Sequence, residues 1–197
     1  MTRISFVAVA AVWLITACVT SAESQQTPKG SNVNPDAKMI ADFKARVDDY
    51  AKLRDGLASK APALAKTSDP GAITAAEKGV ADQVRAARAT AKRGDIFTPA
   101  TEAMIRRQLA RPIKGPDGPE NKRAIKEDSP DPKEIPFKVN ATYPKDEALG
   151  TAPPDVLLAL PELPKDKEIE YRFVGKHILL YDAKANLIVD FMLNALP

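Results

Sequence analysis

The last part of the chain alternates between apolar and polar residues. Apolar side chains fall at nearly every second position across 169–173, 178–180 and 187–191, and turn residues separate these runs. Such alternation over short runs indicates β-strands with one buried face. The pair Gly175-Lys176 suits a two-residue hairpin loop with glycine at its first central position. We therefore predict an antiparallel meander of about three strands between Glu168 and Met192.

The hairpin loop also predicts the strand register and the two faces of the sheet. It pairs Val174 with His177 and Glu170 with Tyr181. A turn through 183–186 then brings the third strand alongside, with Leu187, Val189 and Phe191 beside Asp182, Leu180 and Ile178. The predicted core face is almost wholly apolar: Ile169, Tyr171, Phe173, Ile178, Leu180, Leu187, Val189 and Phe191. We call the opposite side the mixed face: Glu170, Arg172, Val174, His177, Leu179, Tyr181, Ile188, Asp190 and Met192.

Before the meander, apolar residues recur at helical spacings. Capping residues followed by proline at Asn34-Pro35, Asp69-Pro70 and Thr98-Pro99 begin three predicted helices, over 34–59, 68–94 and 98–111. The second helix has a small inner face, which favours an antiparallel hairpin with the first. That inner face contains Ile73, Ala76, Val80, Val84, Ala87 and Ala91. Arg54 interrupts the stripe of the first helix, so we expect it to extend from the edge of that stripe to solvent. Pro112 is expected to end the third helix.

A proline-rich segment separates these helices from the strands. Nine prolines between 112 and 154 argue against a long regular element, apart from a short edge strand at Phe137 and Val139. The segment is either an arm wrapped over the domain or a mobile loop, and its apolar residues favour the arm. One or two helical turns are expected to follow from Pro154 to Leu160. The predicted fold is thus α+β, as one domain at 34–197 made of a helical part at 34–112, the arm at 113–153 and a β-part at 154–197.

The first residues are typical of a secretory signal peptide. Arg3 precedes about 12 largely apolar residues, which is shorter than the roughly 20 that span a bilayer. Two processing sites compete: cleavage before Glu23, giving a signal peptide of 1–22, or lipidation of Cys18 after residues 1–17. Residues 23–33 would then form a disordered tether. We predict an exported, periplasmic protein, anchored to the membrane if Cys18 is lipidated; as the only cysteine, Cys18 excludes an intrachain disulfide.

Charge is distributed unevenly along a chain whose net charge is only +3. Residues 85–126 hold 11 basic against 4 acidic side chains, whereas residues 127–197 hold 8 against 13. The candidate binding residues of this basic segment are Arg85, Arg88, Lys92, Arg106, Arg107 and Arg111. They suit a polyanion or an anionic membrane surface. The alternative is that they are solvated or balance the acidic C-terminal part; nucleic acid is not expected, because no aromatic residues are interleaved for base stacking.

Catalytic candidates are few. His177 is the only histidine, so a site built from several imidazoles is excluded, and we expect no metal and no cofactor. An acid–base pair of His177 with Asp190 on the mixed face is the weak catalytic hypothesis. Arg172 and Tyr181 are candidate binding residues on the same face. That face is expected either to bind a protein partner or a second copy of the chain, or to be covered by the arm.

Four parts of the sequence stand out as runs: G-D-I-F-T-P at 94–99 with R-R at 106–107, G-P-D-G at 115–118, E-Y-R-F-V-G at 170–175 and D-A-K-A-N-L-I-V-D-F at 182–191. Together they resemble a family of uncharacterised exported bacterial proteins. The resemblance implies export and a shared fold, without an activity. We therefore expect a non-enzymatic envelope protein that acts as an interaction or structural module. The alternatives are binding of anionic lipid headgroups or another polyanion through 85–126 and, further, an enzyme that uses His177 and Asp190.

Overall fold

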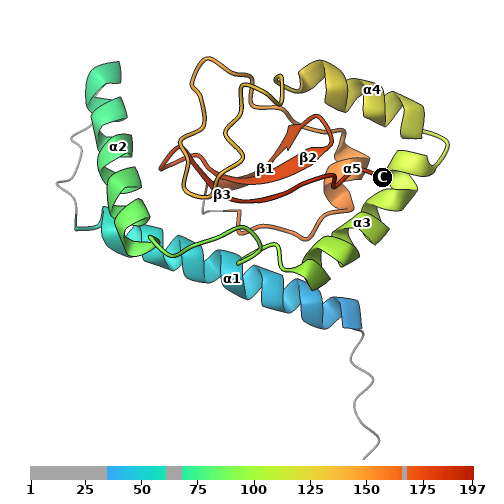
Figure 1. Ribbon diagram of the computed structural model, residues 1–197, viewed down its shortest axis with the longest axis horizontal. Coiled ribbons are helices and arrows are strands. Elements are labelled where there is room, and N and C mark those ends of the chain that lie inside the picture. The colour runs from blue at the N-terminus through green and yellow to red at the C-terminus, as the bar shows by residue number, and fades with distance from the viewer. Residues whose placement is uncertain (1–34, 61–67, 166–167) are drawn as a thin grey trace, which may run out of the picture. The chain divides into compact units, whose positions relative to one another are not determined.

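The computed structural model describes residues 35–60, 68–165 and 168–197 (Figure 1). The predicted signal peptide, Cys18 and the tether lie outside the described residues. The helices are α1 (Pro35–Ala58), α2 (Pro70–Ala87), α3 (Pro99–Lys114), α4 (Gly118–Asp128) and α5 (Pro154–Leu158). The strands are β1 (Ile169–Val174), β2 (His177–Asp182) and β3 (Leu187–Met192). Helices precede a C-terminal antiparallel meander in the order β1-β2-β3, so the α+β prediction is confirmed.

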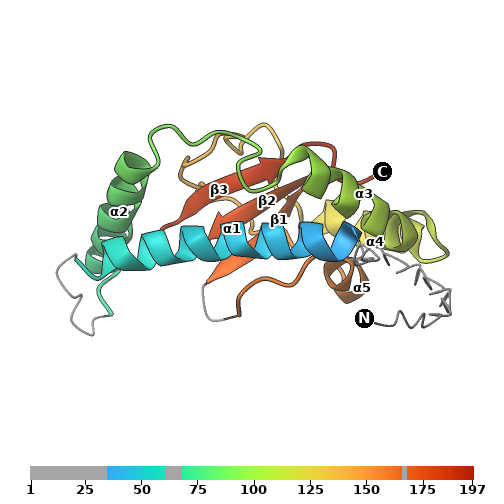
Figure 2. The same cartoon turned by 90° about the horizontal axis from the view of Figure 1, so that it is seen from below.

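One face of the sheet carries the main core. Helix α1 runs along this face and contributes Phe43 and Val47, while α3 contributes Met104 and Leu109 (Figure 2). These side chains pack against the apolar residues of the strands. Burial of each large apolar side chain stabilises the fold by about 1.5 to 3 kcal/mol. The strand side of this core is Ile169, Phe173, Ile178, Leu180, Leu187, Val189 and Met192.

The predicted register holds for the first pair of strands and fails within the second. Val174 pairs with His177 and Glu170 with Tyr181, as predicted. In the β2–β3 pair, a bulge leaves Val189 between the pairs Tyr181–Ile188 and Leu180–Asp190. Because one extra residue reverses the side on which all later residues point, Asp190 lies on the core side and Phe191 on the opposite side. The predicted faces of these residues and of Met192 are therefore wrong.

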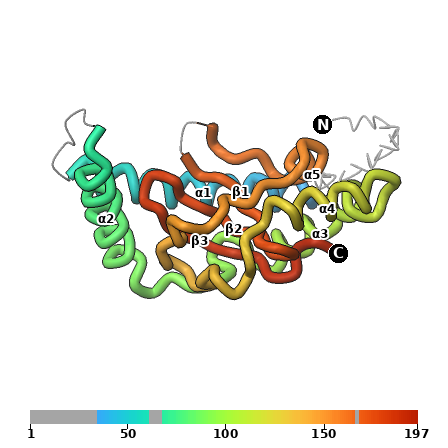
Figure 3. The backbone as a smooth tube through the Cα atoms, turned by 90° about the horizontal axis from the view of Figure 1, so that it is seen from above, coloured from blue at the N-terminus to red at the C-terminus, as the bar shows by residue number. Residues whose placement is uncertain are grey.

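The second face of the sheet is closed by residues 129–153, which we call the covering segment (Figure 3). Ile135 and Tyr143 pack there against Leu179, Ile188 and other buried side chains of the strands. The segment also bonds to both outer strands: the Phe173 N–H donates to the Gly150 carbonyl at 2.9 Å, and the Ile188 N–H donates to that of Ala141 at 2.8 Å. The predicted arm is present, but its bridge to β3 is at Thr142 rather than at Phe137 and Val139.

The helices differ from their predictions at their ends. Helix α2 stops at Ala87, before Gly94, and stands across the C-terminal end of α1 instead of running back along it (Figure 1). Only Val80, Ala81 and Val84 of α2 are buried, so its predicted inner face is too long. The next residues, 88–97, run beside α1, and Phe97 stacks on Phe43 with ring centroids 5.5 Å apart. The predicted antiparallel hairpin of helices is therefore not formed.

Helix α4 contradicts the expectation that residues 112–154 hold no long regular element. Pro112 lies within the last turn of α3, and Pro119 stands in the first turn of α4, where the missing N–H is harmless. Gly118 allows the two helices to meet, since a Cβ there would lie 2.3 Å from the Ile113 carbonyl oxygen. Ile113 and Ile125 are then buried between the helices and the sheet. Apolar burial thus stabilises a helix in a segment that its prolines suggested was irregular.

Candidate functional site

His177 and Asp190 do not form a pair. Asp190 accepts hydrogen bonds from the backbone N–H groups of Ile96 and Phe97, at 2.8 and 2.9 Å, on the core side of the sheet. Burial raises the pKa of its carboxyl group. His177 lies on the covered side, where its Nδ1 accepts from the Asn194 N–H at 3.0 Å. The acid–base hypothesis is therefore wrong in its geometry, and Asp190 acts to hold the loop that contains the G-D-I-F-T-P run.

His177 has an apolar environment. The Phe137 ring meets it edge-on, with centroids 4.8 Å apart. Desolvation lowers the pKa of the imidazole, and the neutral ring is the form whose Nδ1 accepts a hydrogen bond. This arrangement fixes the C-terminal residues against the β1–β2 turn.

A buried ionic cluster joins α1 to the end of β2. The Arg54 guanidinium donates to Asp182 Oδ1 at 2.8 Å, and the Tyr50 hydroxyl donates to Oδ2 at 2.6 Å. Arg54 is 1% exposed and Asp182 is fully buried, so the prediction that Arg54 reaches solvent is wrong. The N–H groups of Lys184 and Ala185 also donate to Oδ1. Four donors thus engage this carboxylate, three at Oδ1 and one at Oδ2, which indicates a structural role.

The predicted basic stripe is largely used inside the molecule. Arg88 donates to the Asn140 side chain at 2.8 Å and its guanidinium lies 4.9 Å from the centre of the Tyr50 ring. Arg85 donates to the Asn140 carbonyl at 3.0 Å. Both arginines therefore tie α2 to the covering segment. Lys92 is exposed.

The arginines of α3 divide into paired and unpaired residues. Arg106 pairs with Glu102 at 3.0 Å and Arg107 with Asp36 at 2.7 Å. Arg93 pairs with the same Glu102 at 2.9 Å. Arg111 is exposed and forms no ion pair with any residue that the structure describes. Of the predicted binding arginines, only Arg111 has no ion pair or hydrogen bond with a described side chain. The others contact residues of the chain itself.

Arg172 and Tyr181, the predicted binding residues of the mixed face, also make internal contacts. Arg172 pairs with Glu170, and its guanidinium lies 5.8 Å from the centre of the Tyr181 ring. The Tyr181 hydroxyl donates to Asn186 Oδ1 at 3.0 Å. Leu179 and Ile188 are fully buried under the covering segment. The mixed face is covered, so it is not an open surface for a partner.

A groove lined by three lysines lies between α4 and the β1–β2 turn. Lys122 and Lys126 are one turn apart on α4, and Lys176 stands in the turn. Its floor is apolar, formed by Ile125 and the buried Leu196, and its volume is about 370 Å³. Within 35–60, 68–165 and 168–197, none of the three ammonium groups forms an ion pair. We call this cavity the lysine groove.

Sequence reasoning included Lys122 and Lys126 in the basic segment but did not single them out. Their spacing of four on one helix was readable from the sequence. Their meeting with Lys176, about 50 residues later, depends on how α4 packs beside the turn. The backbone N–H groups of Ala195 and Leu196 donate to the Lys176 carbonyl, at 2.8 and 3.2 Å, and hold the apolar floor in place.

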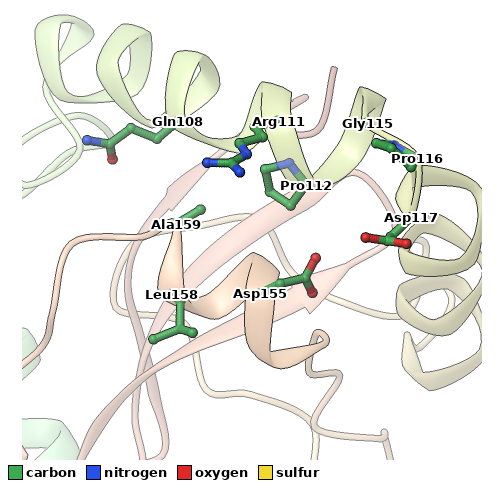
Figure 4. Close-up of a pocket in the computed structure, with 9 residues that line it drawn as sticks. All are labelled: Gln108, Arg111, Pro112, Gly115, Pro116, Asp117, Asp155, Leu158 and Ala159. Atoms are coloured by element: carbon green, nitrogen blue, oxygen red, sulfur yellow. The ribbon is translucent and has the colours of Figure 1, made fainter.

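A second cavity lies between α3 and α5, and we call it the α3–α5 cleft. Figure 4 shows Arg111 on the α3 side, with the carboxylates of Asp117 and Asp155 turned toward one another further along. The cleft has a volume of about 540 Å³. Its lining is Gln108, Arg111, Pro112, Gly115, Pro116, Asp117, Asp155, Leu158 and Ala159. The first three residues of the G-P-D-G run, 115–117, therefore form part of the wall of a cavity.

Comparisons with protein-family models, with curated proteins and with solved structures give no match. The family resemblance therefore stays a prediction. In the part of the chain that the structure describes, no helix is long and apolar enough to cross a membrane. The described residues also hold no group of three or more His, Cys, Asp or Glu side chains placed to bind a metal ion.

Proposed function

We propose that the chain is an exported, non-enzymatic protein of the bacterial envelope that binds anionic lipid headgroups in the lysine groove. The observation that carries this proposal is the set of three ammonium groups, Lys122, Lys126 and Lys176, that surround an apolar floor and form no ion pair with a described residue. A lipid phosphate suits the ammonium groups, and the glycerol and first acyl carbons suit Ile125 and Leu196. Free phosphate would leave that floor unused.

The size of the effect follows from the charges. Each lysine near an anionic membrane surface contributes about 1 kcal/mol, so three contribute roughly 3 kcal/mol, or about a hundredfold in partition. The signal peptide predicted at residues 1–22, or 1–17 with lipidation of Cys18, would bring the protein to such a surface. Binding should fall steeply with added salt, because exposed charges are screened.

The test measures sedimentation of the protein with lipid vesicles. The protein carries Cys18→Ala, so that no covalent lipid contributes, and the vesicles contain phosphatidylcholine with or without phosphatidylglycerol. We expect binding only to the anionic vesicles. Glycerol phosphate in solution should compete weakly, since it lacks the acyl chains that contact the floor.

Charge reversal locates the site. Lys122→Glu, Lys126→Glu and Lys176→Glu together should lower the partition at least about a hundredfold. The matched control reverses three exposed lysines outside the basic segment, Lys38, Lys52 and Lys60, with the same change in net charge. Equal losses in both triple variants, or no binding of the parent protein to anionic vesicles, would show the proposal to be wrong. Circular dichroism checks that each variant is folded.

A further inference from the structure

We propose that the α3–α5 cleft binds a short peptide through the peptide's free amino terminus. This inference is independent of lipid binding, because the cleft and the lysine groove have no lining residue in common. It begins with charges that the protein leaves uncompensated. Asp117, Asp155 and Arg111 are exposed and form no ion pair with described residues, although all three line one cavity. A ligand that carries a positive and a negative group can bridge them.

The acidic side of the cleft is arranged by a buried amide. Asn121 is 5% exposed, and its Nδ2 donates to Asp155 Oδ2 at 2.7 Å and to the Pro112 carbonyl at 2.8 Å. One oxygen of Asp155 is thereby held, and Figure 4 shows its carboxylate turned toward that of Asp117. Two carboxylates that face one another suit an ammonium group, which has three N–H donors.

The α3 wall supplies a further acceptor. Pro112 lies inside the helix and has no N–H, so position 112 donates no hydrogen bond to the Gln108 carbonyl one turn earlier. Gln108, Arg111 and Pro112 all line the cleft. The Arg111 guanidinium is suited to a peptide carbonyl or carboxylate, and we infer that the Gln108 backbone carbonyl, which residue 112 does not use, can accept from a peptide N–H.

The opposite wall offers an apolar contact. Leu158 is 86% exposed, the most of the exposed large apolar side chains in the described part of the chain. Together with Ala159 it can contact an aliphatic peptide side chain, at the end of the cleft away from Pro116 (Figure 4). The volume of about 540 Å³ lies within the range of roughly 300 to 1,000 Å³ that is typical of small-ligand sites. A tripeptide with a free amino group and an aliphatic residue matches both the charges and the apolar wall.

The test is an NMR titration of the ¹⁵N-labelled full chain carrying Cys18→Ala. The probes are the tripeptide Leu-Ala-Leu with free ends, its N-acetylated form, its C-terminal amide, and free leucine. We expect Leu-Ala-Leu to shift the amide signals of residues 108–117 and 155–159. N-acetylation should weaken binding at least about tenfold, because it removes the charge that the carboxylates recognise. Free leucine should bind more weakly than the tripeptide.

Variants then assign the contacts. Asp117→Asn with Asp155→Asn should weaken Leu-Ala-Leu about as much as acetylation does, and acetylation should cause no further loss in that variant. The control for these charge changes is Asp128→Asn, which removes the charge of an exposed carboxylate on α4 outside the cleft. Leu158→Ser tests the apolar wall and changes only an exposed side chain. Absence of cleft shifts with every tripeptide, or equal binding of the free and acetylated forms, would overturn the proposal. The signals of β1–β3 report whether each variant is folded.

Discussion

Two groups of basic residues from one segment have opposite environments. We call Arg85, Arg88, Arg93, Arg106 and Arg107 the paired group, because each contacts an acceptor elsewhere in the described chain. We call Arg111, Lys122 and Lys126, with Lys176 of the β1–β2 turn, the open group, since these line the cavities without an ion pair to any described residue.

The difference shows that a high density of basic residues does not by itself indicate a binding surface. The paired group connects α2 and α3 to the covering segment, to α1 and to the residues after β3, so each of its charges already has a partner within the chain. The open group lies where α3, α4 and the hairpin turn meet, and its charges remain accessible to a ligand. The role of a charged side chain therefore depends on its contacts, and many of these contacts are with residues far away in the sequence.

The largest effect on stability should come from Arg54, a buried arginine of α1 that lies outside the basic segment and pairs with Asp182. Arg54→Met leaves the Asp182 carboxylate buried without its cation. Breaking one side of such a pair lowers the free energy of unfolding by about 3 to 5 kcal/mol. Urea denaturation measures the change, and Lys52→Ala, an exposed substitution on the same helix, is the control. A loss below about 1 kcal/mol would mean that the pair does not stabilise the fold.

A smaller loss is expected at Arg88. Arg88→Ala removes the hydrogen bonds to the Asn140 side chain and the Val189 carbonyl, and the contact with the Tyr50 ring. We expect a loss of about 2 kcal/mol, together with faster hydrogen exchange at Asn140 and Ile188, whose N–H groups lie at the bridge between the covering segment and β3. Unchanged hydrogen exchange at these two amides would show that Arg88 does not hold the covering segment in place.

The contribution of His177 to the free energy of unfolding should be smaller still, and it should depend on pH. Its pKa in the folded state is lowered from 6.5 by desolvation. The unfolded chain therefore binds the proton more readily, so stability is complete above pH 6.5 and declines as the pH falls below it. The titration of this single imidazole by NMR gives the pKa directly.

His177→Gln is the control for that titration, because it keeps an acceptor for the Asn194 N–H without a titrating ring. The difference in stability between the two proteins should change below pH 6.5 and be constant above it. A pKa above 6.5 in the folded protein would contradict the environment formed by Phe137.

The smallest effect should come from the open group. Replacement of Lys122, Lys126 and Lys176 together by alanine removes no ion pair of the described chain. We expect the free energy of unfolding to change by no more than about 0.5 kcal/mol per position, and to rise if repulsion between the ammonium groups is felt. A loss comparable with that of Arg88→Ala would place these lysines in the paired group.

The parts of the fold that local chemistry specifies were predictable. Gly175 has a positive φ of 56°, and the alternation around it is enough to set the β1–β2 register. Proline and capping residues also marked the starts of α1, α2 and α3. By contrast, the bulge at Val189 could not be read from an alternating run, because the run looks the same with or without one extra residue.

The candidate sites were less predictable than the fold. Helix α4 was missed because prolines and glycines usually indicate a break in regular structure. Here Pro119 lies in the first turn, where a proline is tolerated, and Gly118 allows α4 to approach α3 closely. Without α4 there is neither a lysine groove nor the acidic side of the α3–α5 cleft. The pairing of Arg85 and Arg88 with Asn140 joins residues more than 50 positions apart, which periodicity cannot detect.

The sequence by itself thus determined the α+β class, the order of most elements and the first hairpin, because these depend on neighbours within a few residues. Only the tertiary structure decided which face of β3 carries Asp190, which arginines form internal contacts and which cations have no ion-pair partner among the described residues. The physical reason is the distance along the chain over which each interaction acts. Capping, turns and alternation act locally, whereas the partner of a charge is set by packing between segments that the chain brings together only when it folds.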